Sequence, residues 1–298
     1  MTPPLKIIFF GTSAFAVPAL TRLHEAGWHI VGVITKPDEP AGRGQELMSP
    51  PIKVAAEALH LPVYQFPALT RKELDDHVEV ADLAVVAAYG KMIPPDALTF
   101  ARLGTLNIHP SLLPRWRGPS PIQSAILHGD AESGVSIMML DQEMDHGPLL
   151  AQQVVAFHER LPRYPELHEA LAELGATLLV RVLPLWLAGE ITPEAQDDSK
   201  ATFCKLIKKD DGRIEWGKSA QHIERTTRAY DPWPGAWTLW PQAGRIYRIR
   251  IDEADITDED PGTGVPGHAW KHADNGLFVR AGNGSVIARR ITIEGKKS

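Results

Sequence analysis

The sequence is poor in cysteine, in long apolar runs and in net charge, and each shortage excludes a class of protein. Cys204 is the single cysteine among 298 residues, which excludes an internal disulfide framework and a multi-cysteine metal cluster. Uninterrupted apolar runs stay far below the ~18–20 residues needed to span a bilayer, so we expect no membrane partner. The net charge of −6 excludes a chain that coats nucleic acid with a uniformly basic surface.

The rest of the composition is that of an ordinary globular protein. Hydrophobic residues make up 44% and charged residues 23% of the chain, and its length predicts two domains. Ile7–Phe10, the apolar run near the N-terminus, is too short for a signal peptide, so we expect a cytoplasmic protein. We expect a first domain over residues 1–190, a linker over 191–204 and a second domain over 205–298.

Short apolar runs alternate with helical patterns through the first domain. This alternation predicts an α/β fold, a Rossmann-like parallel sheet with helices on both faces. Gly11-Thr12-Ser13 follows the first strand, but the Gly-x-Gly-x-x-Gly spacing is missing, which argues against a dinucleotide cofactor. The strands expected here are Lys6–Phe10, Ile30–Ile34, Leu83–Ala88, Thr105–Ile108 and Gly134–Leu140, and the helices are Val17–Ala26, Val54–Leu59 and Glu166–Trp186.

The second domain has a different pattern of short strand-like runs separated by Gly, Pro and Asp. This pattern predicts a small OB-like β-barrel. Residues 205–298 carry 16 basic and 13 acidic residues, whereas residues 1–204 carry 15 and 24. The change of sign favours an anionic partner for the second domain. The strands expected are Trp237–Trp240, Arg245–Ile251, Gly276–Arg280 and Ser285–Ile293.

The residues that indicate chemistry are densest between Leu106 and Asp130. Asn107 and His109 are two positions apart at the end of a predicted strand, so their side chains point to the same face. Ligands bind at the carboxyl ends of strands in open α/β sheets, and an amide and an imidazole can stabilise a developing oxyanion there. The alternative is an ordinary strand-end Asn and a buried His. Four nearby prolines shape an exposed loop that no simple turn requires, which favours the functional interpretation.

A carboxylate follows the next predicted strand. Asp145 stands in a Gly-Pro turn after Gly134–Leu140, where it could orient His109 or relay a proton. Asp141 is its rival for this role, and an Asp that only shapes the turn is the alternative to both. The chain has 12 histidines but no His-Glu-x-x-His and no paired cysteines, so we expect no metal.

Two of these segments resemble one family. The run from Asn107 to Gly118, Asn-Ile-His-Pro-Ser-Leu-Leu-Pro-Arg-Trp-Arg-Gly, followed by Met144–Pro148, resembles the folate-dependent formyltransferases. Further segments resemble the branch of this family that formylates the methionine carried by initiator tRNA. They are Gly11-Thr12 with Phe15-Ala16, Pro37–Gly44, Lys205–Ile214 and Asp231–Trp237. The resemblance covers nearly the whole chain.

The resemblance implies the reaction, the partners and the residues that serve them. The formyl group would pass from 10-formyltetrahydrofolate to the α-amino group of methionyl-initiator tRNA, in a monomer without a metal. Asn107, His109 and Asp145 match the catalytic residues of the family. Ser111, Leu112, Leu113 and Pro114 match its folate-binding segment, and Val86, Tyr89 and Gly90 are expected to line the pterin pocket. The residues expected to bind tRNA are Arg43, Lys205, Lys208 and Lys209.

Three other functions are compatible with parts of this pattern. The nearest is a formyltransferase that acts on a nucleotide-linked amino sugar. Three features argue against it: Trp116, the 37–51 loop and Asp211–Ile214. A formyltetrahydrofolate hydrolase or dehydrogenase domain is less favoured because of the Pro-rich motif in the second domain. A folate- or RNA-binding protein without catalysis is disfavoured because Asn107, His109 and Asp145 occur together.

Overall fold

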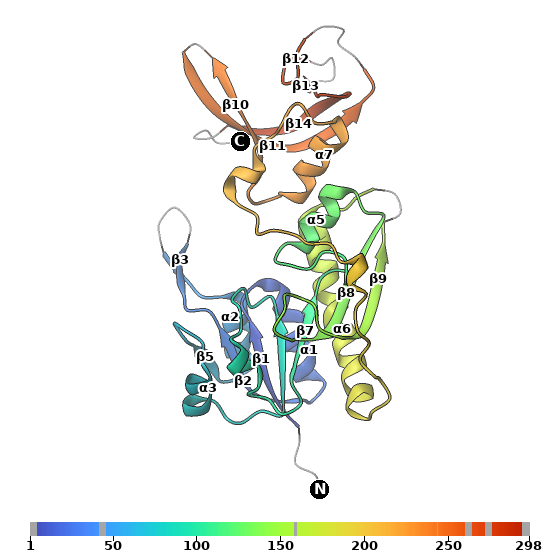
Figure 1. Cartoon of the computed structure of the whole chain (residues 1–298). Helices are drawn as coiled ribbons and strands as arrows, with labels where there is room; N and C mark the ends of the chain where they lie inside the picture. Colours follow the sequence, from blue (N-terminus) through green and yellow to red (C-terminus); the bar gives the residue numbers. More distant parts are fainter. Residues whose placement is uncertain are drawn as a thin grey trace. The chain divides into compact units, whose positions relative to one another are not determined.

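The first part of the chain is built around a seven-stranded sheet of order β5-β2-β1-β6-β7-β8-β9 (Figure 1). The computed structural model describes residues 5–41, 46–157, 160–242, 244–259, 264–271 and 276–293. The strands of this sheet are β1 (Lys6–Gly11), β2 (His29–Thr35), β5 (Val63–Gln65), β6 (Leu83–Ala87), β7 (Thr105–His109), β8 (Glu132–Met139) and β9 (Leu149–Ala156). The elements around it are η1 (Ala14–Ala16), α1 (Val17–Glu25), the hairpin β3 (Glu39–Ala41) and β4 (Glu46–Met48), α2 (Pro51–Ala58), α3 (Arg71–His77), α4 (Pro95–Leu98), α6 (Tyr164–Leu187) and η2 (Asp198–Lys200).

The sheet is mostly parallel, which confirms the predicted α/β fold. Strand β1 pairs in parallel with β2 and with the central strand β6, and β6 pairs in parallel with β7. The strand after β7 differs from the expectation, because β8 runs antiparallel to β7. Ile7, Ile8 and Phe9 of β1 are fully buried, as expected for a strand with both faces covered. The carboxyl ends of β6 and β7 therefore lie next to each other at one edge of the sheet.

Helix α6 packs against β7 and β8. A Cβ placed on Gly175 would lie 2.6 Å from Cγ2 of Ile108, so the helix backbone approaches the sheet where only glycine fits. By length and composition α6 could cross a membrane, and 44% of its most apolar window is buried within the protein. Its buried residues include Leu171, Ala176 and Leu179, which face the core. This burial explains why the helix is so apolar: its apolar residues pack in the core of the protein.

The chain forms two units, and each contains more than one segment of sequence. The first unit consists of residues 1–119, 133–155 and 168–204, and the second consists of 120–132, 156–167 and 205–298. The second unit contains α5 (Pro121–His128), η3 (Lys209–Gly212), α7 (Ala220–Ala229), β10 (Ala236–Gln242), β11 (Arg245–Thr257), β12 (Ala269–Lys271), β13 (Leu277–Arg280) and β14 (Ser285–Ile293).

An antiparallel five-stranded sheet of order β10-β11-β14-β13-β12 forms the second unit's framework (Figure 1). It confirms the predicted small β domain, although within the described residues β10 and β12 do not pair, so the sheet is a half-barrel rather than a closed one. Helix α7 covers it with Ala220 and Ile223, which share a core with Ile251 and Val286. Each strand expected in this domain overlaps an observed one. The expected strand 237–240 lies in β10 and 245–251 lies in β11, whereas 276–280 overlaps β13 and 285–293 coincides with β14.

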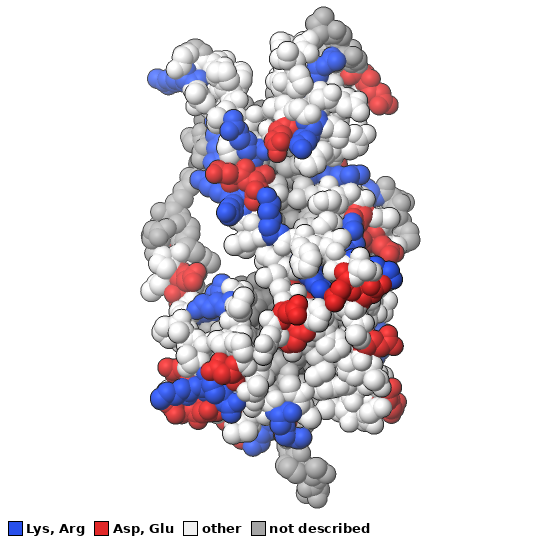
Figure 2. Space-filling view, in the orientation of Figure 1, with Lys and Arg blue, Asp and Glu red and all other residues white. Residues whose placement is uncertain are grey.

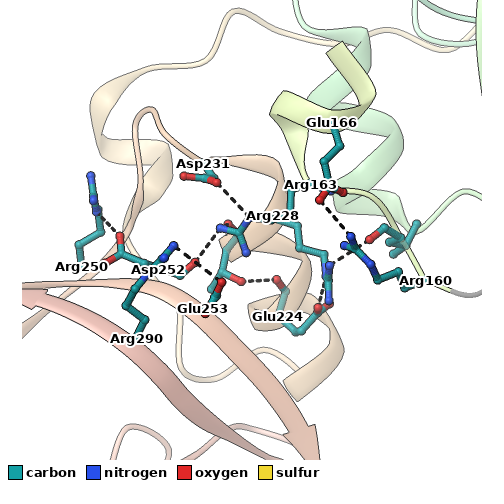
Figure 3. Close-up of polar contacts among 12 residues, drawn as sticks. Arg160, Arg163, Glu166, Glu224, Arg228, Asp231, Arg250, Asp252, Glu253 and Arg290 are labelled. Atoms are coloured by element: carbon teal, nitrogen blue, oxygen red, sulfur yellow. Dashed lines mark hydrogen bonds and ion pairs between the residues drawn. The ribbon is translucent and has the colours of Figure 1, made fainter. Parts of the chain in front are cut away.

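Arginines tie the segment 156–167 to the rest of the second unit (Figure 3). Nε of Arg163 donates to Oδ2 of Asp231 at 3.0 Å, and its Nη2 donates to the carbonyl of Asp252 at 2.6 Å. Arg228 of α7 pairs with Glu224 and donates from Nη1 to the carbonyl of Leu161 at 3.0 Å. Breaking one partner of such a half-buried network leaves the other unsatisfied, so these contacts hold the segment in place.

The fully buried Leu83 of β6 provides a test of this core. We expect Leu83→Ala to lower the free energy of unfolding by about 2–5 kcal/mol, because it removes apolar contacts and leaves a cavity in a close-packed sheet. Val80→Ala is the control, since that side chain is 71% exposed and truncation costs at most about 0.5 kcal/mol. Urea titration followed by circular dichroism measures both. Equal effects of the two substitutions would contradict the assigned packing.

Candidate active site

Strand β7 carries Asn107 and His109 to the carboxyl edge of the first sheet. Both point to one face because they are two residues apart, and they pair in register with Met138 and Ser136 of β8. Asn107 is 9% and His109 4% exposed. Among the described residues, no hydrogen-bond partner is found for the side-chain amide of Asn107. An amide of this kind, nearly buried at the end of a strand, is available to a ligand.

His109 lies between a backbone carbonyl and a carboxylate. Its Nε2 is 3.0 Å from the carbonyl oxygen of Trp116, and its Nδ1 is 3.6 Å from Oδ1 of Asp145. A carbonyl oxygen only accepts hydrogen bonds, so Nε2 carries the hydrogen. Nδ1 is therefore the ring atom that can gain or lose a proton, and it faces Asp145.

Asp145 is held in a left-handed backbone conformation. Its φ is 49°, which is uncommon for a residue with a side chain and occurs where the surrounding structure imposes it. Oδ2 accepts a hydrogen bond of 2.8 Å from the amide of Gly118, which leaves Oδ1 directed at His109. The rival Asp141 has another partner, because its Oδ2 bonds to Nδ1 of His146 at 2.7 Å. The structure thus brings Asp145, and not Asp141, to His109.

The segment expected to bind folate is a rigid loop after β7. The hydroxyl of Ser111 donates to the carbonyl of Arg115 at 2.6 Å. The hydroxyl of Ser136 donates to the carbonyl of Ser111 at 2.7 Å and accepts from the amide of Leu113 at 3.1 Å. Ser111 and Leu113 are buried, whereas Leu112 and Pro114 are half-buried. These hydrogen bonds fix the backbone of residues 111–114 beside the catalytic candidates.

Trp116 is a second residue with a left-handed backbone in this loop. Its φ is 63°, its ring is largely buried, and the guanidinium of Arg115 stacks over the ring at 4.4 Å. The amide of Trp116 donates to the hydroxyl of Thr202 at 2.9 Å. This conformation directs the Trp116 carbonyl at Nε2 of His109, so it helps to define the tautomer of the ring.

The end of β6 turns sharply at the same edge of the sheet. Ala88 and Gly90 have φ values of 43° and 72°, and the hydroxyl of Thr12 donates to the carbonyl of Tyr89 at 2.7 Å. Val86 and the Tyr89 ring are buried in the core, where Tyr89 packs edge-on against Phe10, and burial raises the pKa of the Tyr89 hydroxyl. The segment 86–90 thus offers a ligand its backbone rather than its rings.

The residues expected to bind tRNA lie elsewhere in the sequence and in part outside the described structure. Arg43 lies outside the described residues. Lys205, Lys208 and Lys209 are exposed in the second unit, and Nζ of Lys205 is 3.7 Å from Oδ1 of Asp211. On the face seen in Figure 2, Lys and Arg side chains of the second unit are interspersed with Asp and Glu. The three lysines are sterically available to an anionic partner.

Other groups at the site were not identified from the sequence as functional. Thr202 and Gln196, in the stretch expected as a linker, hydrogen-bond to the loops that carry Trp116 and Asp145. Residues this far apart in the chain leave no spacing signal by which to find them. Within the described part of the chain, no group of three His, Cys, Asp or Glu side chains is placed to hold a metal ion.

Comparison with known families gives a consistent result over the whole chain. Residues 5–183 match the formyl transferase family, and residues 206–298 match the formyl transferase C-terminal domain. The methionyl-tRNA formyltransferase of Chloroflexus aurantiacus is 49% identical over 88% of this chain and 84% of its own length. That of Roseiflexus sp. is 45% identical over 99% and 90%, and that of Stutzerimonas stutzeri is 41% identical over 100% and 93%.

Solved structures share the fold at low sequence identity. The N-formyltransferase of Helicobacter canadensis, in complex with folinic acid and dTDP-3-aminofucose, has a TM-score of 0.69 at 16% identity, covering 95% of this chain and 98% of its own. The methionyl-tRNA formyltransferase of Clostridium thermocellum has a TM-score of 0.58 at 14% identity, covering 86% and 95%. Likeness at this level supports the architecture and does not discriminate between substrates.

His146, next to the catalytic candidate, provides a pH-dependent test. Its hydrogen bond with Asp141 raises the pKa of the imidazole above 6.5, with further contributions from Glu143 and Asp198. A basic group whose pKa is higher in the folded than in the unfolded protein stabilises the fold. This stabilisation is complete at a pH below the unfolded-state pKa and is lost as the pH rises through the folded-state pKa. We expect the melting temperature lost in His146→Gln to be largest near pH 5.5 and to shrink toward pH 9.

The matched control for this test is His24→Gln, because His24 is exposed near the end of α1. Differential scanning fluorimetry across the pH range measures both variants. A loss in His146→Gln that is constant with pH, or that grows as pH rises, would contradict the ion pair.

Proposed function

Because the chain belongs to the formyl transferase family and has folate-dependent methionyl-tRNA formyltransferase activity, we propose that Asn107, His109 and Asp145 are its catalytic residues. The observation that carries the proposal is the position of His109, with Nε2 bound to the Trp116 carbonyl and Nδ1 facing Asp145. We further propose that the formyl donor is 10-formyltetrahydrofolate and that the acceptor is methionyl-initiator tRNA.

The reaction needs stabilisation of one developing charge and removal of one proton. The α-amino nitrogen attacks the formyl carbon, a C–N bond forms, and the formyl oxygen becomes an oxyanion. The amine then loses a proton, and the tetrahedral intermediate collapses with cleavage of the bond to N10 of the folate, which takes up a proton. The products are formylmethionyl-tRNA and tetrahydrofolate.

The three side chains match these needs. The Asn107 amide donates to the oxyanion, and the nearly buried position makes this interaction stronger than in water. His109 in its protonated form donates through Nδ1, because Nε2 is occupied by the Trp116 carbonyl. Asp145 stabilises the charged ring and accepts the proton of the attacking amine through Oδ1, since Oδ2 is engaged by the Gly118 amide.

The folate is proposed to bind between two backbone segments. Ser111, Leu112, Leu113 and Pro114 form one wall through the hydrogen-bonded loop after β7, and Val86, Tyr89 and Gly90 form the other. The second segment presents carbonyl and amide groups at its left-handed turn, which suit the hydrogen-bonding edge of a pterin ring. Structural relatives bind folates: one was solved with tetrahydrofolic acid and another with 5-formyltetrahydrofolate.

The tRNA is proposed to contact both parts of the chain. Arg43 of the 37–51 loop would approach the acceptor end, and Lys205, Lys208 and Lys209 would neutralise backbone phosphates. We propose that residues 1–190 carry catalysis and residues 205–298 carry tRNA binding, joined by the stretch 191–204, in a cytoplasmic monomer. An acceptor that is a nucleotide-linked amino sugar has no observation in its favour, because the relatives that use such sugars share only the fold.

Loss of the Asn107 amide tests the catalytic assignment. We expect Asn107→Ala to lower kcat for formylation of methionyl-initiator tRNA by about 10²–10³, as for loss of one oxyanion donor. Binding of the folate, followed by fluorescence quenching, should be unchanged. Asn283→Ala, at an exposed turn of the second unit, is the control and should retain full activity. Turnover of Asn107→Ala within twofold of the wild type would refute the oxyanion role.

Salt dependence tests the proposed binding of phosphates. A Lys208→Ala/Lys209→Ala double variant should bind tRNA more weakly, and its plot of log K against log salt should be shallower by about 0.7–0.9 for each phosphate that is no longer neutralised. Lys72→Ala removes an exposed charge from α3, where Lys72 pairs with Asp76, and serves as the control. Filter binding at several salt concentrations measures the slopes. An unchanged slope in the double variant would remove these lysines from the interface.

A further inference from the structure

Gln196 connects the stretch 191–204 to the turn that carries Asp145. Its Nε2 donates to the carbonyl of Asp145 at 2.9 Å and to the carbonyl of Gly147 at 2.8 Å. A primary amide has two N–H groups, so both donors are used and both carbonyls of the turn are satisfied. The two carbonyls flank His146, and one side chain therefore spans the whole turn.

The opposite end of the same amide is fixed by an arginine. Oε1 of Gln196 accepts from Nε of Arg117 at 3.1 Å and from Nη2 at 2.9 Å. Nη2 of Arg117 also donates to Oδ1 of Asp198 at 2.7 Å, and Arg117 is only 4% exposed. The planar guanidinium fixes the orientation of the amide, so that the oxygen faces Arg117 and the nitrogen faces the turn.

Backbone contacts hold the same stretch along the loop after β7. The amide of Arg117 donates to the carbonyl of Thr202 at 2.9 Å, and the amide of Cys204 donates to the carbonyl of Arg117 at 2.8 Å. Gly118 follows with φ of 116°, and a Cβ there would lie 2.4 Å from the Cys204 carbonyl. The stretch of chain that carries Gln196 is thus hydrogen-bonded to the loop after β7, and the Gly118 amide of this loop binds Asp145.

We propose that Gln196 is a positioning residue for catalysis, which keeps Asp145 in its left-handed conformation so that Oδ1 faces Nδ1 of His109. The inference rests on the proposed catalytic role of Asp145. A left-handed non-glycine residue persists only where its surroundings determine it, and Gln196 supplies side-chain hydrogen bonds to two carbonyls of this turn. Arg117 acts through Gln196 and orients its amide. Neither residue is assigned contact with the reacting atoms.

The decisive variant is Gln196→Glu, which keeps the size and the acceptor for Arg117 but replaces two donors with a carboxylate oxygen facing two carbonyls. We expect kcat to fall about 10²-fold, the effect of displacing a catalytic group by roughly 1 Å. KM for folate and for tRNA should stay within about threefold of the wild type, because neither binding segment contains Gln196. The melting temperature identifies any general loss of folding.

The pH profile separates positioning from a merely structural role. When the introduced carboxyl of Q196E gains a proton, it can again donate one hydrogen bond to the turn. The activity of Q196E relative to wild type should therefore rise as pH falls from 8 to 5.5. Gln196→Met lacks both donors at every pH, and its relative activity should be low and independent of pH.

Gln153→Glu is the matched control, because Oε1 of Gln153 also accepts from an arginine, Nη2 of Arg181 at 3.2 Å, and Gln153 does not contact the Asp145 turn. It should have full activity at each pH. Asp145→Asn is measured alongside. If Asp145→Asn is inactive and Q196E has wild-type kcat, the positioning role is overturned and the proposed function stands. If Asp145→Asn retains full turnover, the catalytic role of Asp145 fails first.

A fall in activity of Q196E that comes wholly from KM, or that is matched by Gln153→Glu, would also overturn the proposal. Unfolding of both Gln196 variants at assay temperature would overturn it as well, because Gln196 would then serve the fold as a whole.

Discussion

The site depends on the way the loop after β8 closes on the end of that strand. The amide of Met139 donates to the carbonyl of Pro148 at 2.9 Å, and a Cβ on Gly147 would lie 2.0 Å from the Met139 carbonyl. Only glycine fits so close to the backbone, so the chain returns to the sheet at this residue. This return brings Asp145 across to His109 on the neighbouring strand, and the contacts to Gly118 and Gln196 depend on it.

The sequence predicted candidate residues of the site on the strand and in the loops, but not the distant contacts that hold the loops in place. Asn107 and His109 follow from the two-residue period of a strand, and the structure places them together at its end. The sequence favoured Asp145 and left Asp141 as its rival because both follow the same strand, and the observed loop brings Asp145 to His109. Gln196 and Thr202 act through hydrogen bonds to residues 79 and 86 positions away, which no local pattern encodes.

The fold shows the same division between local and non-local information. The apolar runs at β1, β2, β6 and β7 predicted the sheet, and the structure confirms it. The three-residue β5 is too short to leave a period, and the antiparallel direction of β8 depends on how the chain returns from α5. The amphipathic α7 was not predicted, because its apolar positions are partly small residues and threonines whose burial depends on the sheet beneath them.

The segmented composition of the second unit has a consequence for how it can be isolated. A fragment cut before Lys205 would lack residues 120–132 and 156–167, which belong to this unit. It would lose the carbonyl of His128 that accepts from Arg225 and the guanidinium of Arg163 that bonds to Asp231, and the face of α7 toward α5 would be exposed to water. A soluble fragment therefore has to be designed around the contacts of α7 rather than around the place where the sequence pattern changes.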